Sequence, residues 1–323
     1  MENFKNLPTV KKIGFNRIIL VLVLIAMYFI FSLGSGRMLG QSDLMNALNM
    51  VDYLGFLALG VTFVIATGGI DFSIGPVMVC SGLIAGRLLV TFGWPLALAL
   101  VMCVVVGLCF GIFNGILVAY MGLPSFISSM ASMMLAKGVG SVFTHVQNSN
   151  WPATGAPNSQ YKYFVSYNGI PTGLIFLVVV AVICAILMNK TKVGRYILCI
   201  GSNREAVRLS GVDTRKWEAL AYVICGVLAG IAAITYVGVI TQVQPGLGDE
   251  FNNNAIASCV MGGTSMAGGV ASIGGTFIGV LIISLLRVGI QAMGFRPDYQ
   301  YIITGIIVAL AVFADIRSKA RKK

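Results

Sequence analysis

The chain has 323 residues, of which 57% are hydrophobic and 10% are charged, and its formal net charge at pH 7 is +11. Soluble domains carry about 25% charged residues, and the mean hydropathy here is +0.90. This composition excludes a large soluble domain and predicts an all-α polytopic membrane protein with a single transmembrane domain over residues 1–323. The basic charge does not indicate nucleic-acid binding, because no folded basic domain is available to carry it.

Apolar runs predict the membrane-crossing elements of the first half, since about 20 apolar residues in a helix cross a hydrocarbon core of about 30 Å. The first run, residues 18–33, follows four basic residues and resembles a signal peptide. We expect it to be retained as a span, because it is long and no convincing cleavage site follows. Further elements are expected at 44–67, 77–90, 94–120, 126–143 and 170–188.

The sequence GGIDFSIGP at 68–76 interrupts this apolar pattern. Its glycine pair, its residues suited to helix capping and its proline together predict a chain break followed by a helix restart. Irregular backbone at membrane depth is tolerated only where it is buried in protein or lines a cavity. We therefore expect a broken element beside the translocation path, in which Asp71 either caps the helix or contacts the transported solute.

The second half predicts spans at 217–240, 272–293 and 299–313, which brings the total to about ten elements. The run at 254–262 is too short to cross alone and is interpreted as a half-helix. Residues 68–76 and 246–262 each place glycines and an acidic residue before a small-residue helix, which favours an inverted repeat. An alternative alignment pairs 68–75 with 268–275.

The basic residues predict the orientation, because they mark the cytoplasmic side of short membrane loops. Sixteen of the 22 lysines and arginines lie in three segments, with four in residues 1–17, seven in 190–216 and five in 317–323. We expect these two tails and this loop to be cytoplasmic. The loop at 144–169 holds one basic residue, Lys162, and is expected outside.

The loop at 190–216 reads KTKVGRYILCIGSNREAVRLSGVDTRK and is a polar island in a membrane chain. Ser202 or Asn203 is suited to cap a short helix that has Glu205 in its first turn, Arg208 near its end and Gly211 as its stop. Two interpretations remain open. The helix contacts another protein, or it lies flat on the bilayer surface.

Catalytic and cofactor sites are not expected. The single histidine, His145, and the scattered acids supply neither a Ser-His-Asp arrangement nor a histidine-rich metal site. The chain has no G-x-x-x-x-G-K-[ST] motif, and the glycine-rich GGTSMAGG at 262–269 lacks the lysine. We therefore expect a non-enzyme without bound cofactor, and any ATP and Mg used for transport must bind to a partner subunit.

Three motifs resemble one family. GRYILCIGSNREAVRLSGVDTRKW at 194–217 resembles the cytoplasmic loop of bacterial ABC importer permeases of the ribose, galactose and xylose type. ATGGIDFSIG at 66–75 resembles the TGGIDLSVG signature of that family. QPGLGDEFNNNAIASCVMGGTSMAGG at 244–269 resembles its G-x-G-Y-E-L-D-A-I-A-A-V-V-x-G-G-T-S-L-x-G-G segment. The likeness extends from residue 44 to the C-terminal lysines.

The resemblance implies a type II ABC importer architecture, similar to the vitamin B12 importer, in the bacterial cytoplasmic (inner) membrane. It implies as partners an ATPase on the cytoplasmic side, a second copy of the permease, a periplasmic or lipid-anchored sugar-binding protein and membrane lipid. The ATPase-coupling residues would be Gly201, Ser202, Asn203, Arg204, Glu205, Ala206, Val207, Arg208, Leu209 and Gly211.

The candidate residues of the translocation path are polar or small and come from five segments of the chain: Asn46, Asn49, Asp52, Tyr53, Gly68, Gly69, Asp71, Ser73, Asn114, Ser128, Ser132, Asn252, Asn254 and Ser258. Such residues also bind membrane helices to one another, and both interpretations stay open. The chain departs from the family at Asn252 and Asn254, where amides replace two acids. We expect the neighbouring Asp249 and Glu250 to substitute for them in part.

The function expected from these features is import of a monosaccharide by alternating access, powered by a separate ATPase subunit. An alternative is an ion-coupled secondary transporter of a small polar solute, which would also use broken helices and inverted repeats. A passive channel is a third. The capped helix of the polar loop favours the first, because a secondary carrier has no mechanical need for it.

Overall fold

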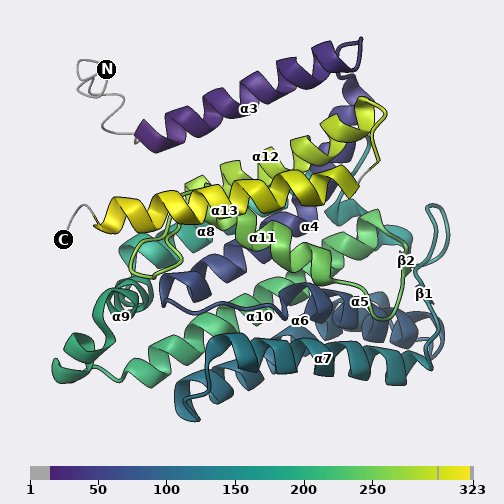
Figure 1. Cartoon of the computed structure of the whole chain (residues 1–323). Helices are drawn as coiled ribbons and strands as arrows, with labels where there is room; N and C mark the ends of the chain where they lie inside the picture. The colour runs from purple at the N-terminus through teal and green to yellow at the C-terminus, as the bar shows by residue number, and fades with distance from the viewer. Residues whose placement is uncertain (1–14, 297, 321–323) are drawn as a thin grey trace.

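The computed structural model describes residues 15–296 and 298–320, and this part of the chain is almost entirely helical (Figure 1). The α-helices are α3 (Phe15–Gly34), α4 (Gln41–Ala66), α5 (Ile74–Val90), α6 (Leu96–Gly115), α7 (Ser125–Thr144), α8 (Thr172–Lys190), α9 (Lys192–Leu209), α10 (Thr214–Val239), α11 (Asp249–Met261), α12 (Ile273–Ala292) and α13 (Asp298–Ala320). Six basic residues of the two tails that are expected to be cytoplasmic lie outside the described residues: Lys5, Lys11, Lys12, Arg321, Lys322 and Lys323.

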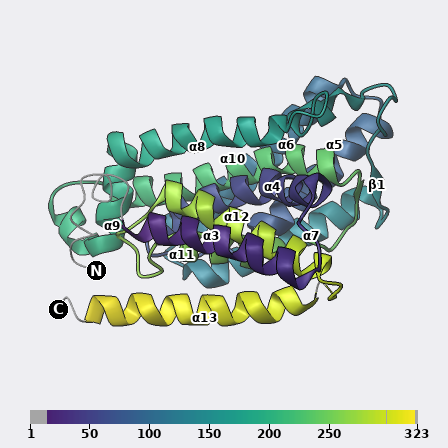
Figure 2. The same ribbon diagram turned by 90° about the horizontal axis from the view of Figure 1, so that it is seen from above.

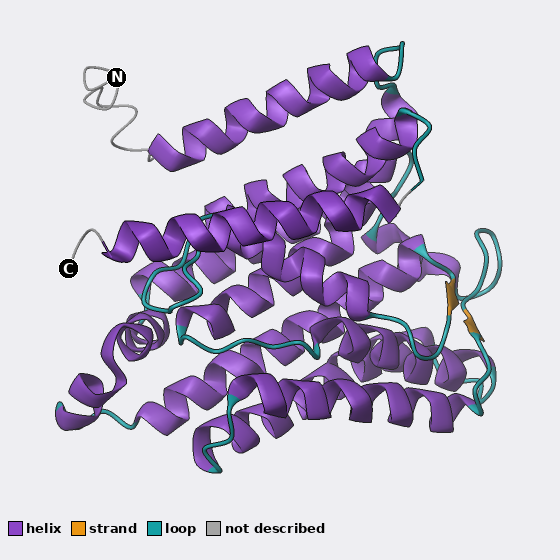
Figure 3. Ribbon diagram, in the orientation of Figure 1, coloured by secondary structure: helices purple, strands orange, loops and turns teal. Residues whose placement is uncertain are grey.

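Smaller elements complete the described chain. The π-helix η1 (Ile116–Tyr120) continues α6, and the 3-10 helix η2 (Ser159–Phe164) lies in the connection between α7 and α8. The short strands β1 (Ser149–Asn150) and β2 (Gln242–Val243) pair in antiparallel fashion, with Ser149 opposite Val243 (Figure 3).

Six described helices are long and apolar enough to cross a membrane, namely α4, α6 with η1, α7, α8, α10 and α12. Residues 18–34 of α3 and the whole of α5 form shorter apolar helices. The prediction of an all-α protein with several spans is therefore confirmed, and six of the expected elements reach full spanning length.

The interior of the bundle is formed by α4, α5, α10, α11 and α12. Of the most apolar window of α4, 89% is buried, whereas the corresponding share is 22% for α8. Helices α6 and α10 pack closely, because Gly107 and Gly111 face Gly226 and Gly230. Each pair is spaced as G-x-x-x-G, the pattern that lets two membrane helices approach backbone to backbone.

The described chain has two distinct ends. In Figures 1 and 2, the start of α3, the whole of α9 and the end of α13 lie at one end, here named the α9 end. β1 and β2 lie at the opposite end, here named the β end. The parts of the three basic segments that the structure describes therefore gather at one end, as the charge distribution predicted.

One predicted element begins at a different residue, and another segment contains more helix than the prediction specified. The expected half-helix at 254–262 begins earlier, at Asp249, because Asp249 and Glu250 suit the positive end of the helix dipole. Within the segment 190–216, which was predicted to contain one short capped helix, α9 begins already at Lys192, because Ile197 and Ile200 are buried in packing contacts. The sequence prediction missed this buried apolar side because the segment is rich in basic residues.

Candidate functional site: the coupling helix and the chain break

Helix α9 is divided at Asn203, whose backbone is non-helical, with φ −161° and ψ 95°. Its side-chain Oδ1 accepts a hydrogen bond from the amide of Ala206 at 3.0 Å. An Asn side chain in this position satisfies one of the orphan donors of a helix start. The predicted capped helix is therefore present over residues 203–209, and Asn203 rather than Ser202 is its cap. It is here named the coupling helix after its expected role.

The coupling helix is exposed. Leu209 is 76% exposed, and Arg204, Glu205, Ala206 and Arg208 are also exposed. The Arg208 guanidinium donates hydrogen bonds to Glu205, and these bonds lower the pKa of that carboxyl. Gly211, with φ +83°, ends the turn in the left-handed conformation that glycine favours. The result is a short charged helix that protrudes at the α9 end.

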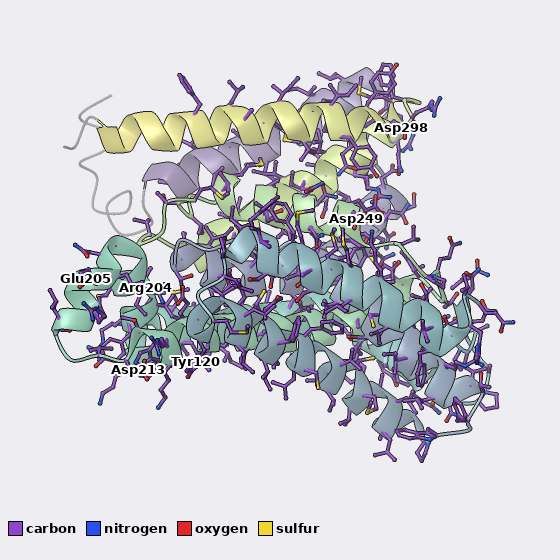
Figure 4. All side chains as sticks on the ribbon, turned by 60° about the horizontal axis from the view of Figure 1, so that its bottom comes forward. Tyr120, Arg204, Glu205, Asp213, Asp249 and Asp298 are labelled. Atoms are coloured by element: carbon purple, nitrogen blue, oxygen red, sulfur yellow. The ribbon has the colours of Figure 1, made fainter. Side chains whose placement is uncertain are left out.

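The start of α10 holds the coupling helix in place. Arg204 forms an ion pair of 2.6 Å with Glu218, which is 7% exposed. Asp213 caps α10 by accepting hydrogen bonds from the amides of Arg215 and Lys216. Figure 4 shows Arg204, Glu205, Asp213 and Tyr120 at the same end of the bundle, away from Asp298.

The predicted chain break lies between α4 and α5, and a buried polar network fixes it. Asp71 Oδ1 accepts hydrogen bonds from the amide and the hydroxyl of Ser73, at 2.8 Å and 2.6 Å. Asn114 of α6 donates to Ser73 at 2.9 Å and accepts from Ser132 of α7. The side chains are at most 2% exposed. The network therefore joins α5, α6 and α7 at the point where α5 begins.

Asn252 of α11 closes the break from the other side. Its Oδ1 accepts a hydrogen bond from the amide of Gly75 at 2.7 Å, and its Nδ2 donates to the carbonyl of Phe72. Only a group that both donates and accepts can make these two bonds, and a carboxylate only accepts. The amide at this position therefore has a structural reason: it ties the start of α11 to the start of α5.

The two acids that begin α11 bind other helices. Asp249 forms an ion pair of 2.7 Å with Lys137 of α7, and Glu250 accepts a hydrogen bond of 2.6 Å from Tyr301 of α13. The start of α11 is thus attached to α5, α7 and α13 at once. Lys137, a cation within the predicted fifth span, is accounted for by this pair.

The remaining path residues are mostly buried within the one chain. Asn46 is exposed and Asn49 half-buried, whereas Tyr53 packs its ring against Tyr236 and Phe251. Side chains that are 2% exposed or less are those of Asp52, Ser128, Asn254 and Ser258. Burial inside one subunit favours packing, and the role of these residues in a path stays a prediction.

Sequence reasoning missed Glu218 and Tyr222 of α10. Tyr222 is fully buried and lies beside Gly69. The sequence did contain a signal for Glu218, which lies one turn into an apolar span and follows a loop that contains arginines. A carboxylate in that setting needs a cationic partner.

Comparison with known proteins agrees with these features. Residues 43–312 match the profile of a family described as the branched-chain amino acid transport system permease component. The chain is 32% identical to the "Ribose import permease protein RbsC" of Escherichia coli K12 over 309 residues, covering 92% of each chain. It is 33% identical to the protein of that name from Bacillus subtilis, over 92% of each.

A further relative is the "Xylose transport system permease protein XylH" of Haemophilus influenzae, which is 29% identical over 94% of this chain and 96% of that protein. No solved structure matches the chain. The family match covers most of the chain, and it includes both the chain break and the coupling helix. The chain therefore belongs to the family of ABC importer permeases, non-enzymatic transport components that include the ribose and xylose permeases.

Proposed function

We propose that this permease carries a monosaccharide across the bacterial cytoplasmic membrane by alternating access, driven by ATP hydrolysis in a separate subunit. ATP and Mg would bind to that ATPase, which docks on the coupling helix at the α9 end. A second copy of the permease completes the path, and a periplasmic or lipid-anchored binding protein delivers the sugar at the β end. The tails and the α9 end would then be cytoplasmic.

The coupling helix is the observation that carries this proposal. It is short, capped by Asn203, exposed, and attached to α10 through the Arg204–Glu218 pair. A helix that lay flat on the bilayer would need a broad apolar face, whereas only Leu209 is strongly exposed among its large apolar residues. The shape and charge fit a protein contact better than a membrane surface.

The path in this proposal runs beside the chain break and along the accessible side of α4 that carries Asn46 and Asn49. The buried network of Asp71, Ser73, Asn114 and Ser132 holds the break in shape. Sugar hydroxyls need donors and acceptors, and polar groups that bind only weakly allow release on the other side. The substrate class is supported by the names of the relatives, which are ribose and xylose permeases.

Uptake into proteoliposomes tests the proposal. The permease would be reconstituted with the ATPase and binding protein of its own host and offered labelled ribose, xylose and galactose, with leucine for comparison. We expect ATP-dependent uptake of one monosaccharide that persists after ionophores collapse the ion gradients. Uptake driven by an ion gradient without ATP, or uptake of leucine alone, would contradict the proposal.

A charge reversal on the coupling helix tests the docking site. Glu205→Arg should lower ATP-dependent uptake by about tenfold, the scale of a coupling free energy between two sites, and should weaken co-elution of the ATPase. The matched control is Asp298→Arg, which reverses a charge in another exposed ion pair, with Arg296, away from the α9 end. Equal uptake in both variants would contradict the docking assignment.

A further inference from the structure

The residues just before the coupling helix make contacts of backbone against backbone. A methyl carbon on Gly201 would overlap the carbonyl oxygen of Ala66 and the amide nitrogen of Gly269. One on Gly268 would lie 2.8 Å from the amide nitrogen of Gly68 and 2.9 Å from the Cα of Gly201. Three segments distant in sequence therefore meet here: α9, the end of α4, and the loop 262–272 between α11 and α12.

The contact also has a directional bond. The amide of Gly269 donates a hydrogen bond of 3.0 Å to the carbonyl of Ala66, the last residue of α4. Carbonyls in the last turn of a helix have no partner within the helix, so this bond satisfies one of them. Gly268 and Gly269 have φ values of +77° and +78°, a region in which residues with a Cβ are strained. Glycine is therefore required at both positions for two reasons: the backbone has a positive φ, and there is no room for a Cβ.

A second contact reaches the same chain break through α10. Glu218 holds Arg204 at the start of the coupling helix, and Tyr222 lies one turn further along α10. A methyl carbon on Gly69 would lie 2.5 Å from the Tyr222 hydroxyl. Gly68 and Gly69 are therefore bounded on one side by the loop 262–272 and on the other by α10, and both of these also contact α9.

We propose that Gly201, Gly268 and Gly269, here named the glycine junction, transmit movement of the coupling helix to the chain break before α5. This inference rests on the proposed function. Packed interiors have low compressibility and transmit strain, and the nearest neighbours of Gly201 and Gly268 are all backbone atoms, which cannot change rotamer to absorb a displacement. A shift of residues 203–209 that also carries Gly201 must therefore move Ala66 and Gly68 or break the junction. Gly201, Gly268 and Gly269 act as positioning residues, through their contacts with the backbone of Ala66 and Gly68.

The test compares uptake with hydrolysis in the reconstituted transporter. Gly201→Ala should lower sugar uptake per ATP hydrolysed by about tenfold, the scale of a coupling between two sites, while the ATPase still co-elutes with the permease. The matched control is Gly305→Ala, in α13, where no atom lies within 4 Å of the added methyl carbon. This control should keep the wild-type ratio. A Gly201→Ala protein that folds and keeps the wild-type ratio would overturn the inference.

A variant that adds no volume covers the case in which Gly201→Ala fails to fold. Glu218→Gln keeps the side-chain shape and removes the charge partner of Arg204. It should also lower uptake per ATP, and an unchanged ratio would overturn the inference in the same way. A wild-type complex without any ATP-dependent uptake would instead refute the proposed function and leave the packing of the junction as found.

Amide hydrogen exchange adds a measurement that a purely structural role of the glycine junction would leave unchanged. In the wild-type complex, a non-hydrolysable ATP analogue should change the exchange of residues 66–73. In Gly201→Ala and Glu218→Gln, this nucleotide-dependent change should be lost. A response of residues 66–73 that survives in both variants would contradict transmission through the junction.

Discussion

Asn252 gives the sharpest test of how the chain break is held, because one side chain serves two backbone groups. It is 2% exposed, accepts from the amide of Gly75 and donates to the carbonyl of Phe72. A buried backbone group left without its partner costs about 1–3 kcal/mol. Asn252→Leu, which is similar in size, leaves both groups unpaired, so we expect a loss of about 2–6 kcal/mol in the free energy of unfolding.

Asn252→Asp separates the two bonds. The carboxylate still accepts from Gly75 near the positive end of the α5 dipole, but it no longer donates to Phe72. One unpaired group predicts a loss of about 1–3 kcal/mol, smaller than for leucine. The loss should shrink at acid pH, because a protonated carboxyl regains a donor.

The assay is thermal unfolding of the purified permease, followed by fluorescence-detected size exclusion after heating. Asn253→Asp is the matched control, since its side chain is exposed on the same helix. The expected order of melting temperature is wild type and control together, then Asn252→Asp, then Asn252→Leu. Equal stability of Asn252→Leu and the control, or equal loss in both Asn252 variants, would refute the two-bond reasoning.

Three further predictions concern the coupling helix and the buried network. Asn203→Ala removes the cap and should cost about 0.5–2 kcal/mol of local stability, seen as faster amide exchange over 203–209; unchanged exchange would argue against the cap. Because Arg208 lowers the pKa of Glu205, the contribution of this ion pair should be complete above the ordinary carboxyl pKa of about 4.3 and should disappear as the pH falls through the lowered value. A carbon-13 titration of the Glu205 carboxyl checks this, and Arg208→Ala should return its pKa to the ordinary range. Asn114→Ala should lower the free energy of unfolding by about 1–3 kcal/mol, measured as a lower melting temperature. A variant as stable as wild type would show that the network does not stabilise the chain break.

Most of the helix positions could be predicted from local sequence patterns. Apolar runs predicted the spans, and the Gly-Gly-Ile-Asp sequence predicted the interruption before α5. Asn203 was one of two expected caps, because the residues that follow it have the charges of a helix start and end. These features depend on a few neighbouring residues, so they can be read from a single chain.

Contacts between distant segments could not be predicted in this way. The glycines at 201, 268 and 269 are visible in the sequence, but no local rule says that they touch. The polar residues Asp71, Ser73, Asn114 and Ser132 were expected beside the path because they lie in membrane segments. Whether such residues face water or one another depends on the packing of α5, α6 and α7, which only the structure supplies.

The short ladder at the β end has a consequence for how the chain is made. β1 and β2 flank α8, α9 and α10 in the sequence, and Trp151 next to β1 donates both to Thr241 and, through its indole, to Gly82. During synthesis, β1 emerges long before its partner strand exists. The connection between α7 and α8 must therefore wait, without its ladder, until α10 has been inserted. Truncation after α8 should leave Trp151 without its partner at Thr241, whereas truncation after β2 should restore that bond.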